Sequence, residues 1–133
     1  MFDKFSRRRG AFTLVEIMIV VAVLALLAAI AMPGFLRARK RSQASQIVND
    51  LRMIDAAVSQ YAIECGKKTG DPVAVEDWTN YLKKNSRLYT TGEDPLGNDY
   101  GPQTVDELPF VPIESYLELG DVADDEFWDP FNP

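Results

Sequence analysis

The sequence predicts an α+β protein in which one long N-terminal helix packs on a small C-terminal domain with short strands and helices. Three observations support this class. An apolar run over residues 11–35 contains a single charge, Glu16, and an amphipathic segment follows it. Residues 66–133 hold seven of the eight prolines and six of the eight glycines, a composition that indicates short elements joined by turns.

The apolar run is long enough to cross a membrane. Residues 17–32 contain no charged or polar side chain. As a helix, residues 11–35 would extend roughly 37 Å, against a hydrocarbon core of about 30 Å. We therefore divide the chain into a basic leader (1–11), a transmembrane helix (12–35), an amphipathic stem helix (36–65) and a small acidic globular region packed on the stem (66–133).

The position of Glu16 leaves three interpretations of this N-terminal segment open. A secretory signal peptide would use Ala29-Ile30-Ala31 as its cleavage site. A plain signal anchor would hold Glu16 near the membrane interface. In the third interpretation Glu16 is functional, because an ionisable residue inside a membrane segment usually has a charged partner. That partner would be a free N-terminal amine on a neighbouring copy, so a misplaced copy would leave a buried charge unpaired.

Residues 7–16, RRRGAFTLVE, are followed by IMIVVAVLALLAAIAMPGFLRARKR. This pattern resembles the N-terminus of type IV pilins and type II secretion pseudopilins. The resemblance implies that a prepilin peptidase removes the leader and N-methylates the new first residue, usually a Phe. It also implies an assembly role for a Glu at the fifth mature position and a proline 21 residues after the Phe. Phe12, Glu16 and Pro33 match these positions.

The cleavage point is open, because the usual Gly before the cut is separated from Phe12 by one residue. Cleavage after Ala11 makes Phe12 the methylated residue and Glu16 the fifth. Cleavage after Gly10 makes Ala11 the methylated residue and Glu16 the sixth.

The stem carries one apolar stripe with helical spacing, which predicts a helix that runs from residue 12 to residue 65 and packs on its own C-terminal domain. Gly66 is a suitable residue to end it. Pro33 and Gly34 interrupt this helix, either as a boundary between two helices or as a kink or melted segment, and the resemblance favours melting in a filament. The stripe consists of Ile47, Leu51, Ile54, Val58 and Tyr61.

In the distal region, residue patterns predict a short helix near 75–84, a strand at 88–91 and another strand around Val105 or 110–111. A helical turn is expected at 115–119, and residues 127–131 are expected to pack onto the domain as a hydrophobic lock. Cys65 is expected to be a small apolar packing residue.

Residues 94–100, DPLGNDY, resemble a DPWGNPY-type loop of major pseudopilins, with Leu96 in place of Trp and Asp99 in place of Pro. The resemblance implies a calcium ion held near this loop and the C-terminus by carboxylate and carbonyl oxygens. The candidate ligands are Asp121, Asp124 and Asp125. Clustered acids are also typical of a solvated surface, so both interpretations stay open, and no cofactor is required.

Composition limits the function. The net charge is −6, with nine Lys/Arg and five Asp/Glu in residues 1–65 against five and fifteen in residues 66–133. An acidic distal region is a poor partner for nucleic acid. The chain has no histidine and one cysteine, which excludes Ser-His-Asp and Cys-His catalytic units and an intrachain disulfide. We therefore expect no enzyme.

The resemblance implies a structural subunit of a homo-oligomeric helical filament, most simply a type II secretion pseudopilus, with a type IV pilus as the alternative. The subunit would cross the bacterial inner membrane once, with its C-terminal domain in the periplasm. Its partners would be membrane lipid before assembly, prepilin peptidase and an inner-membrane assembly platform. From another class, a membrane-anchored periplasmic binding module or a small hydrolase that uses paired carboxylates stays open.

Overall fold

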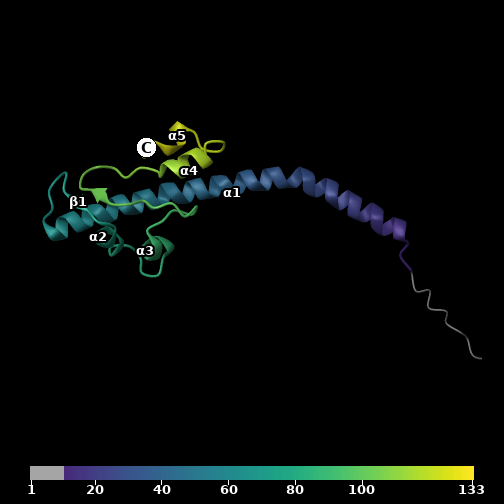
Figure 1. The fold of residues 1–133 in the computed structure, drawn as a ribbon, viewed down its shortest axis with the longest axis horizontal. Coiled ribbons are helices and arrows are strands. Elements are labelled where there is room, and N and C mark those ends of the chain that lie inside the picture. Colours follow the sequence, from purple (N-terminus) through teal and green to yellow (C-terminus); the bar gives the residue numbers. More distant parts are fainter. Residues whose placement is uncertain (1–10) are drawn as a thin grey trace, which may run out of the picture. The chain divides into compact units, whose positions relative to one another are not determined.

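The computed structural model describes residues 11–133. Residues 11–36 belong to one compact unit and residues 37–133 to a second, and each is described by itself. The predicted long helix is present as α1 (Leu14–Cys65), and it continues through Pro33. In the second unit the short elements lie along residues 37–65 of α1 (Figure 1). They are β1 (Pro72–Val73), α2 (Val75–Thr79), α3 (Arg87–Thr91), β2 (Gln103–Thr104), α4 (Ile113–Glu118) and α5 (Asp125–Trp128).

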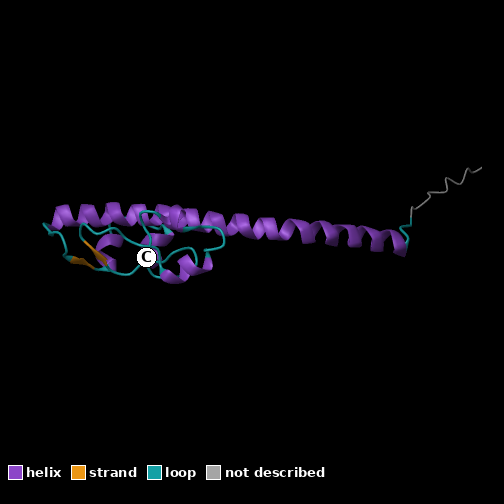
Figure 2. Ribbon diagram, turned by 90° about the horizontal axis from the view of Figure 1, so that it is seen from above, coloured by secondary structure: helices purple, strands orange, loops and turns teal. Residues whose placement is uncertain are grey.

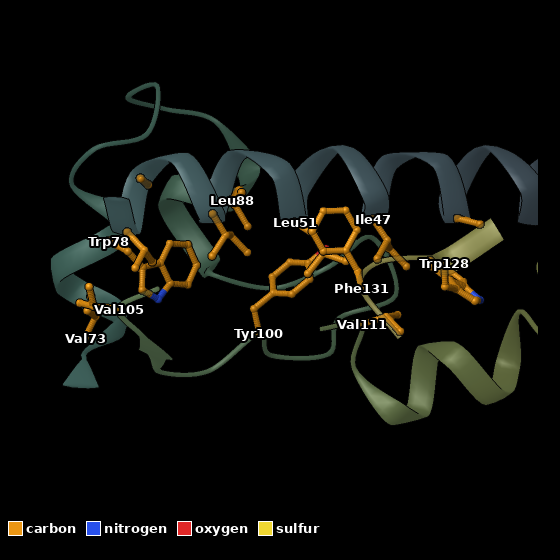
Figure 3. Packing of buried hydrophobic residues seen from close by; sticks show 14 of the residues in the cluster. Ile47, Leu51, Val73, Trp78, Leu88, Tyr100, Val105, Val111, Trp128 and Phe131 are labelled. Carbon is orange, nitrogen blue, oxygen red and sulfur yellow. The ribbon is translucent and has the colours of Figure 1, made fainter. Parts of the chain in front are cut away.

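The core of the second unit forms around the predicted stripe of α1. Ile47, Leu51 and Ile54 are fully buried, and Val58 is 4% exposed. Spacings of three and four residues place these side chains on one helix face, so the C-terminal domain covers that face. Figure 3 shows Leu88, Tyr100 and Phe131 directed toward this stripe, with Trp78 and Trp128 at its two ends. The prediction that the stem packs on its own domain is confirmed.

The two strands are short and antiparallel, with Pro72 opposite Thr104 and Val73 opposite Gln103 (Figure 2). β2 lies next to Val105, where one strand was expected, whereas residues 110–111 form no strand. The backbone of Val111 instead donates a hydrogen bond to the carbonyl of Phe131 at 2.9 Å. This contact fastens the C-terminal segment to the domain, and Trp128 and Phe131 are buried as the predicted hydrophobic lock.

The prediction of a strand at residues 88–91 is wrong, because these residues form α3. Thr90 and Thr91 have β-branched side chains, which favour strands. Two local signals outweigh that preference. The Ser86 hydroxyl caps the helix by accepting from the Tyr89 N–H at 3.2 Å, and Gly92 ends it with a φ of 68°.

The other distal elements lie where the sequence predicts them but differ from the prediction in length. The helix expected near 75–84 is α2, which ends at Thr79, and the helical turn expected at 115–119 is α4. Gly66 ends α1 with a φ of 64°, as predicted. The expectation that Cys65 packs in the core is wrong, because this cysteine is exposed. Ala62 is the last buried residue of α1, so the final turn extends past the core.

We expect Leu51→Ala to lower the free energy of unfolding by about 2–5 kcal/mol, because it leaves a cavity in the centre of the α1 stripe. Met53→Ala is the matched control on the same helix, since Met53 is 39% exposed. Urea unfolding of the full chain in detergent, followed by tryptophan fluorescence, measures both. Equal losses in the two variants would show that the stripe is not the core.

Candidate functional site

The N-terminal half of α1 exposes its apolar side chains. Every residue from 11 to 39 is exposed, and sixteen of them are large hydrophobic residues. Phe12 is 80% exposed and Ile30 is 78% exposed. The helix is long and apolar enough to cross a membrane. An apolar surface of this extent is stable only against lipid or neighbouring protein.

Glu16 lies at the start of this helix in a reciprocal capping arrangement with Thr13. The Thr13 N–H donates to Glu16 Oε2 at 3.1 Å, and the Glu16 N–H donates to Thr13 Oγ1 at 3.2 Å. These bonds satisfy backbone donors that have no partner within the helix. Among the described residues, Glu16 Oε1 accepts no hydrogen bond, so one carboxylate oxygen stays available.

The residues expected to take part in cleavage, methylation and helix bending lie before or within the exposed half of α1. Gly10 lies outside the described residues, while Ala11 and Phe12 are exposed and precede α1. Pro33 and Gly34 lie inside α1, and a Cβ added at Gly34 would meet no atom within 4 Å. Cleavage, methylation and melting at these residues stay predictions.

A buried carboxylate connects α1 to the rest of the second unit. Asp50 is 4% exposed, and its Oδ2 accepts from the Tyr100 hydroxyl at 3.0 Å and from Arg87. Arg87 also donates to the carbonyl of Glu93. Burial and then the neighbouring Asp50 carboxylate raise the pKa of Tyr100, so its hydroxyl stays a donor. This network could not be predicted from the sequence, because Asp50 is one of several polar residues beside the stripe.

The loop at residues 94–100 is organised by a second buried carboxylate. Asp94 is 2% exposed, and its Oδ1 accepts from the N–H groups of Leu96 at 2.8 Å and Asn98 at 2.9 Å. Its Oδ2 accepts from the Ser115 hydroxyl in α4, whose oxygen accepts from Asn98 Nδ2 at 2.7 Å. Asp94 and Asn98 of the loop therefore hold α4 in place through their hydrogen bonds with Ser115.

Each of the three calcium candidates has a different hydrogen-bond partner within the chain. Asp121 pairs with Lys40 at 3.0 Å, and that pairing lowers the pKa of Asp121. Asp124 accepts from the Phe127 N–H and caps α5, whereas Asp125 accepts from the Tyr116 hydroxyl. Among residues 11–133, no group of three His, Cys, Asp or Glu side chains is placed to hold a metal ion. Calcium binding at Asp121, Asp124 and Asp125, with backbone carbonyls as further ligands, stays a prediction.

Comparison with known proteins gives two kinds of match. The prokaryotic N-terminal methylation motif matches residues 6–32. Type II secretion system core protein G of Pseudomonas aeruginosa is 30% identical over 110 residues, which cover 71% of this chain and 72% of that protein. The core protein G of Vibrio cholerae is 29% identical over 105 residues, covering 73% and 72%.

Type IV pilins also match. The type IV major pilin protein PilA of Myxococcus xanthus is 39% identical over 62 residues, which cover 47% of this chain and 28% of PilA. The chain therefore spans little more than a quarter of that relative and nearly three quarters of the core proteins G. No solved structure matches this chain.

An exposed apolar N-terminal helix with a glutamate in its first turn, followed by a small domain packed on the same helix, defines a pilin-like filament subunit. The chain belongs to the type IV pilin and type II secretion pseudopilin family. The resemblance seen in the sequence is confirmed, and the family is a structural one.

We expect Tyr100→Phe to lower the free energy of unfolding by about 1–3 kcal/mol, because it removes a hydrogen bond to a buried carboxylate. Tyr89→Phe is the matched control, since the Tyr89 hydroxyl makes no hydrogen bond among the described residues. Urea unfolding measures both variants. A loss in Tyr89→Phe as large as that in Tyr100→Phe would contradict a specific role for the Asp50 network.

Proposed function

We propose that the filament built from this subunit is the pseudopilus of a type II secretion system. The observation that carries this proposal is the extent of the matches to core protein G. These matches cover nearly three quarters of this chain and of each core protein G, which is more than residues 1–65 could supply, so they extend into residues 66–133. The match to PilA covers 28% of that longer protein, and the match to the major fimbrial protein FimA of Dichelobacter nodosus covers 54% of that protein.

In this proposal the subunit first crosses the inner membrane once, with its basic leader in the cytoplasm and its C-terminal domain in the periplasm. Lipid covers the exposed side chains of residues 12–35 before assembly. A prepilin peptidase removes the leader after Gly10 or Ala11 and methylates the new terminus. The accessible positions of Ala11 and Phe12 ahead of α1 support this step.

Cleavage creates an ammonium group, and the Glu16 carboxylate of a neighbouring copy is its partner. Inside an apolar bundle, attraction between opposite charges is much stronger than in water, and an unpaired charge is costly. The capping bonds of Thr13 use Glu16 Oε2 and leave Oε1 for this contact. The pairing therefore selects the register in which copies pack.

Pro33 and Gly34 locally destabilise α1. Proline has no N–H, so the carbonyl of Ala29 lacks its helical partner, and glycine is a poor helix former. Neighbouring copies can shield the freed carbonyl, which makes local melting tolerable in a filament. In this proposal the chain has a mechanical role and is not an enzyme. An inner-membrane assembly platform adds each copy to the filament.

Deletion of the gene tests the pseudopilus against the type IV pilus. We expect loss of protein secretion with surface piliation unchanged, and we expect complementation to restore secretion. Loss of surface pili with normal secretion would instead assign the subunit to a pilus. A membrane-anchored binding module or hydrolase would keep working when residues 12–35 are replaced by an unrelated anchor, whereas a filament subunit would not.

We expect Glu16→Gln and Glu16→Ala both to abolish filament assembly. Glutamine can form the same capping bonds but carries no charge, so its failure would assign the role of Glu16 to charge pairing. Thr13→Val is the matched control, because it removes a capping hydroxyl and keeps the carboxylate. Normal filaments from Glu16→Gln, with none from Glu16→Ala, would show that helix capping is the function of Glu16.

A further inference from the structure

The outer surface around α4 combines exposed apolar and acidic side chains. Residues 88–133 contain twelve Asp/Glu and no Lys/Arg. Phe110 is 58% exposed, Ile113 57% and Leu117 72%, while Ser115 and Leu119 on the opposite side of α4 are buried. In the sequence, an acidic residue stands directly beside Leu108, Ile113 and Leu117. We call this set the α4 surface: Glu107, Leu108, Phe110, Ile113, Glu114, Leu117 and Glu118, all of which are exposed.

The opposite charge is concentrated on α1, where Arg37 and Arg41 line a shallow hollow together with Asp121 just after α4. Arg37, Arg39, Lys40 and Arg41 follow directly after the apolar half of α1. Lys40 is occupied, because its ammonium group lies 3.0 Å from Asp121 and 3.4 Å from the carbonyl of Glu118. Within the part of the chain that the structure describes, the three arginines form no ion pair and no side-chain hydrogen bond. We call these three arginines the arginine segment.

We propose that the α4 surface of one subunit binds the arginine segment of a second copy of this chain. This inference rests on the proposed filament function. The charges are complementary, and the Lys40–Asp121 pair shows that this basic run and the acidic α4–α5 turn form ion pairs. Arginine suits such a contact, because its guanidinium group binds carboxylates and its stem packs on apolar side chains.

The two surfaces consist of different residues of one subunit, so a contact between the α4 surface of one copy and the arginine segment of the next is heterologous. A heterologous contact whose rotation does not close into a ring leaves a free surface of each kind at the two ends of the oligomer, so it can extend into an open helical assembly. The apolar half of α1 supplies burial, which has no direction, whereas complementary charge favours one register over others. The contact thus adds specificity to the packing of residues 12–35.

Charge reversal in the full chain tests this contact, with filaments assembled in cells. We expect Glu114→Lys combined with Glu118→Lys, and separately Arg39→Glu combined with Arg41→Glu, to lower filament yield by about tenfold. Combining all four changes restores the yield, because the pairing is re-formed with the signs exchanged. Glu76→Lys is the matched control on α2, since Glu76 is exposed and lies outside the α4 surface.

Disulfide trapping provides a second readout that does not depend on yield. In a Cys65→Ser background, Glu114→Cys with Arg39→Cys gives a ladder of cross-linked oligomers on oxidation, whereas either single change gives none beyond a dimer. Monomer with both cysteines linked within one chain would overturn the proposal. Thermal unfolding of each variant confirms that the domain is folded.

Normal filaments from both charge-reversed pairs would also overturn this contact, while loss of filaments in Glu16→Ala would leave the proposed function in place. If the unaltered chain forms no filament in a host with a complete secretion system, the proposed function itself fails. Reduced secretion with normal filaments in the α4 variants would mean that the α4 surface binds another component, which also contradicts a second copy as its occupant.

Discussion

Burial of the α1 stripe is the interaction on which the second unit depends. Its other elements are helices of four to six residues and strands of two residues, which are too short to be stable by themselves. Ile47, Leu51 and Ile54 give them one continuous apolar surface to cover, and the two tryptophans close its ends. The chain has no disulfide to support so small a domain, so the long helix takes that role.

Two buried carboxylates then determine how the covering segments are arranged. Apolar packing alone tolerates many arrangements, whereas a buried charge requires specific donors. Asp50 requires Arg87 and Tyr100, which brings α3 and the end of the 94–100 loop to α1. Asp94 requires Ser115 and its own loop amides, which brings α4 to that loop. Each carboxylate therefore connects segments that are distant in the sequence.

Periodicity along the chain was sufficient to predict α1, its stripe and its end at Gly66, because these depend on residues three or four apart. α3 was not predicted, since a cap at Ser86 and a stop at Gly92 outweighed the strand preference of its threonines. The partners of Asp50 could not be predicted, because they lie 37 and 50 residues away. The capping pair of Thr13 and Glu16 was missed although Thr-x-x-Glu before an apolar run is a readable signal.

The C-terminal lock has a consequence for the order of folding during synthesis. Ile47 and Leu51 are made early, but Trp128 and Phe131, which complete their cover, are made more than 70 residues later. Contacts so distant in sequence form only after both segments are present. The stripe of α1 is thus uncovered while the chain emerges, and the domain closes as a last event. The core of the second unit is therefore completed only when the last residues of the chain have been made.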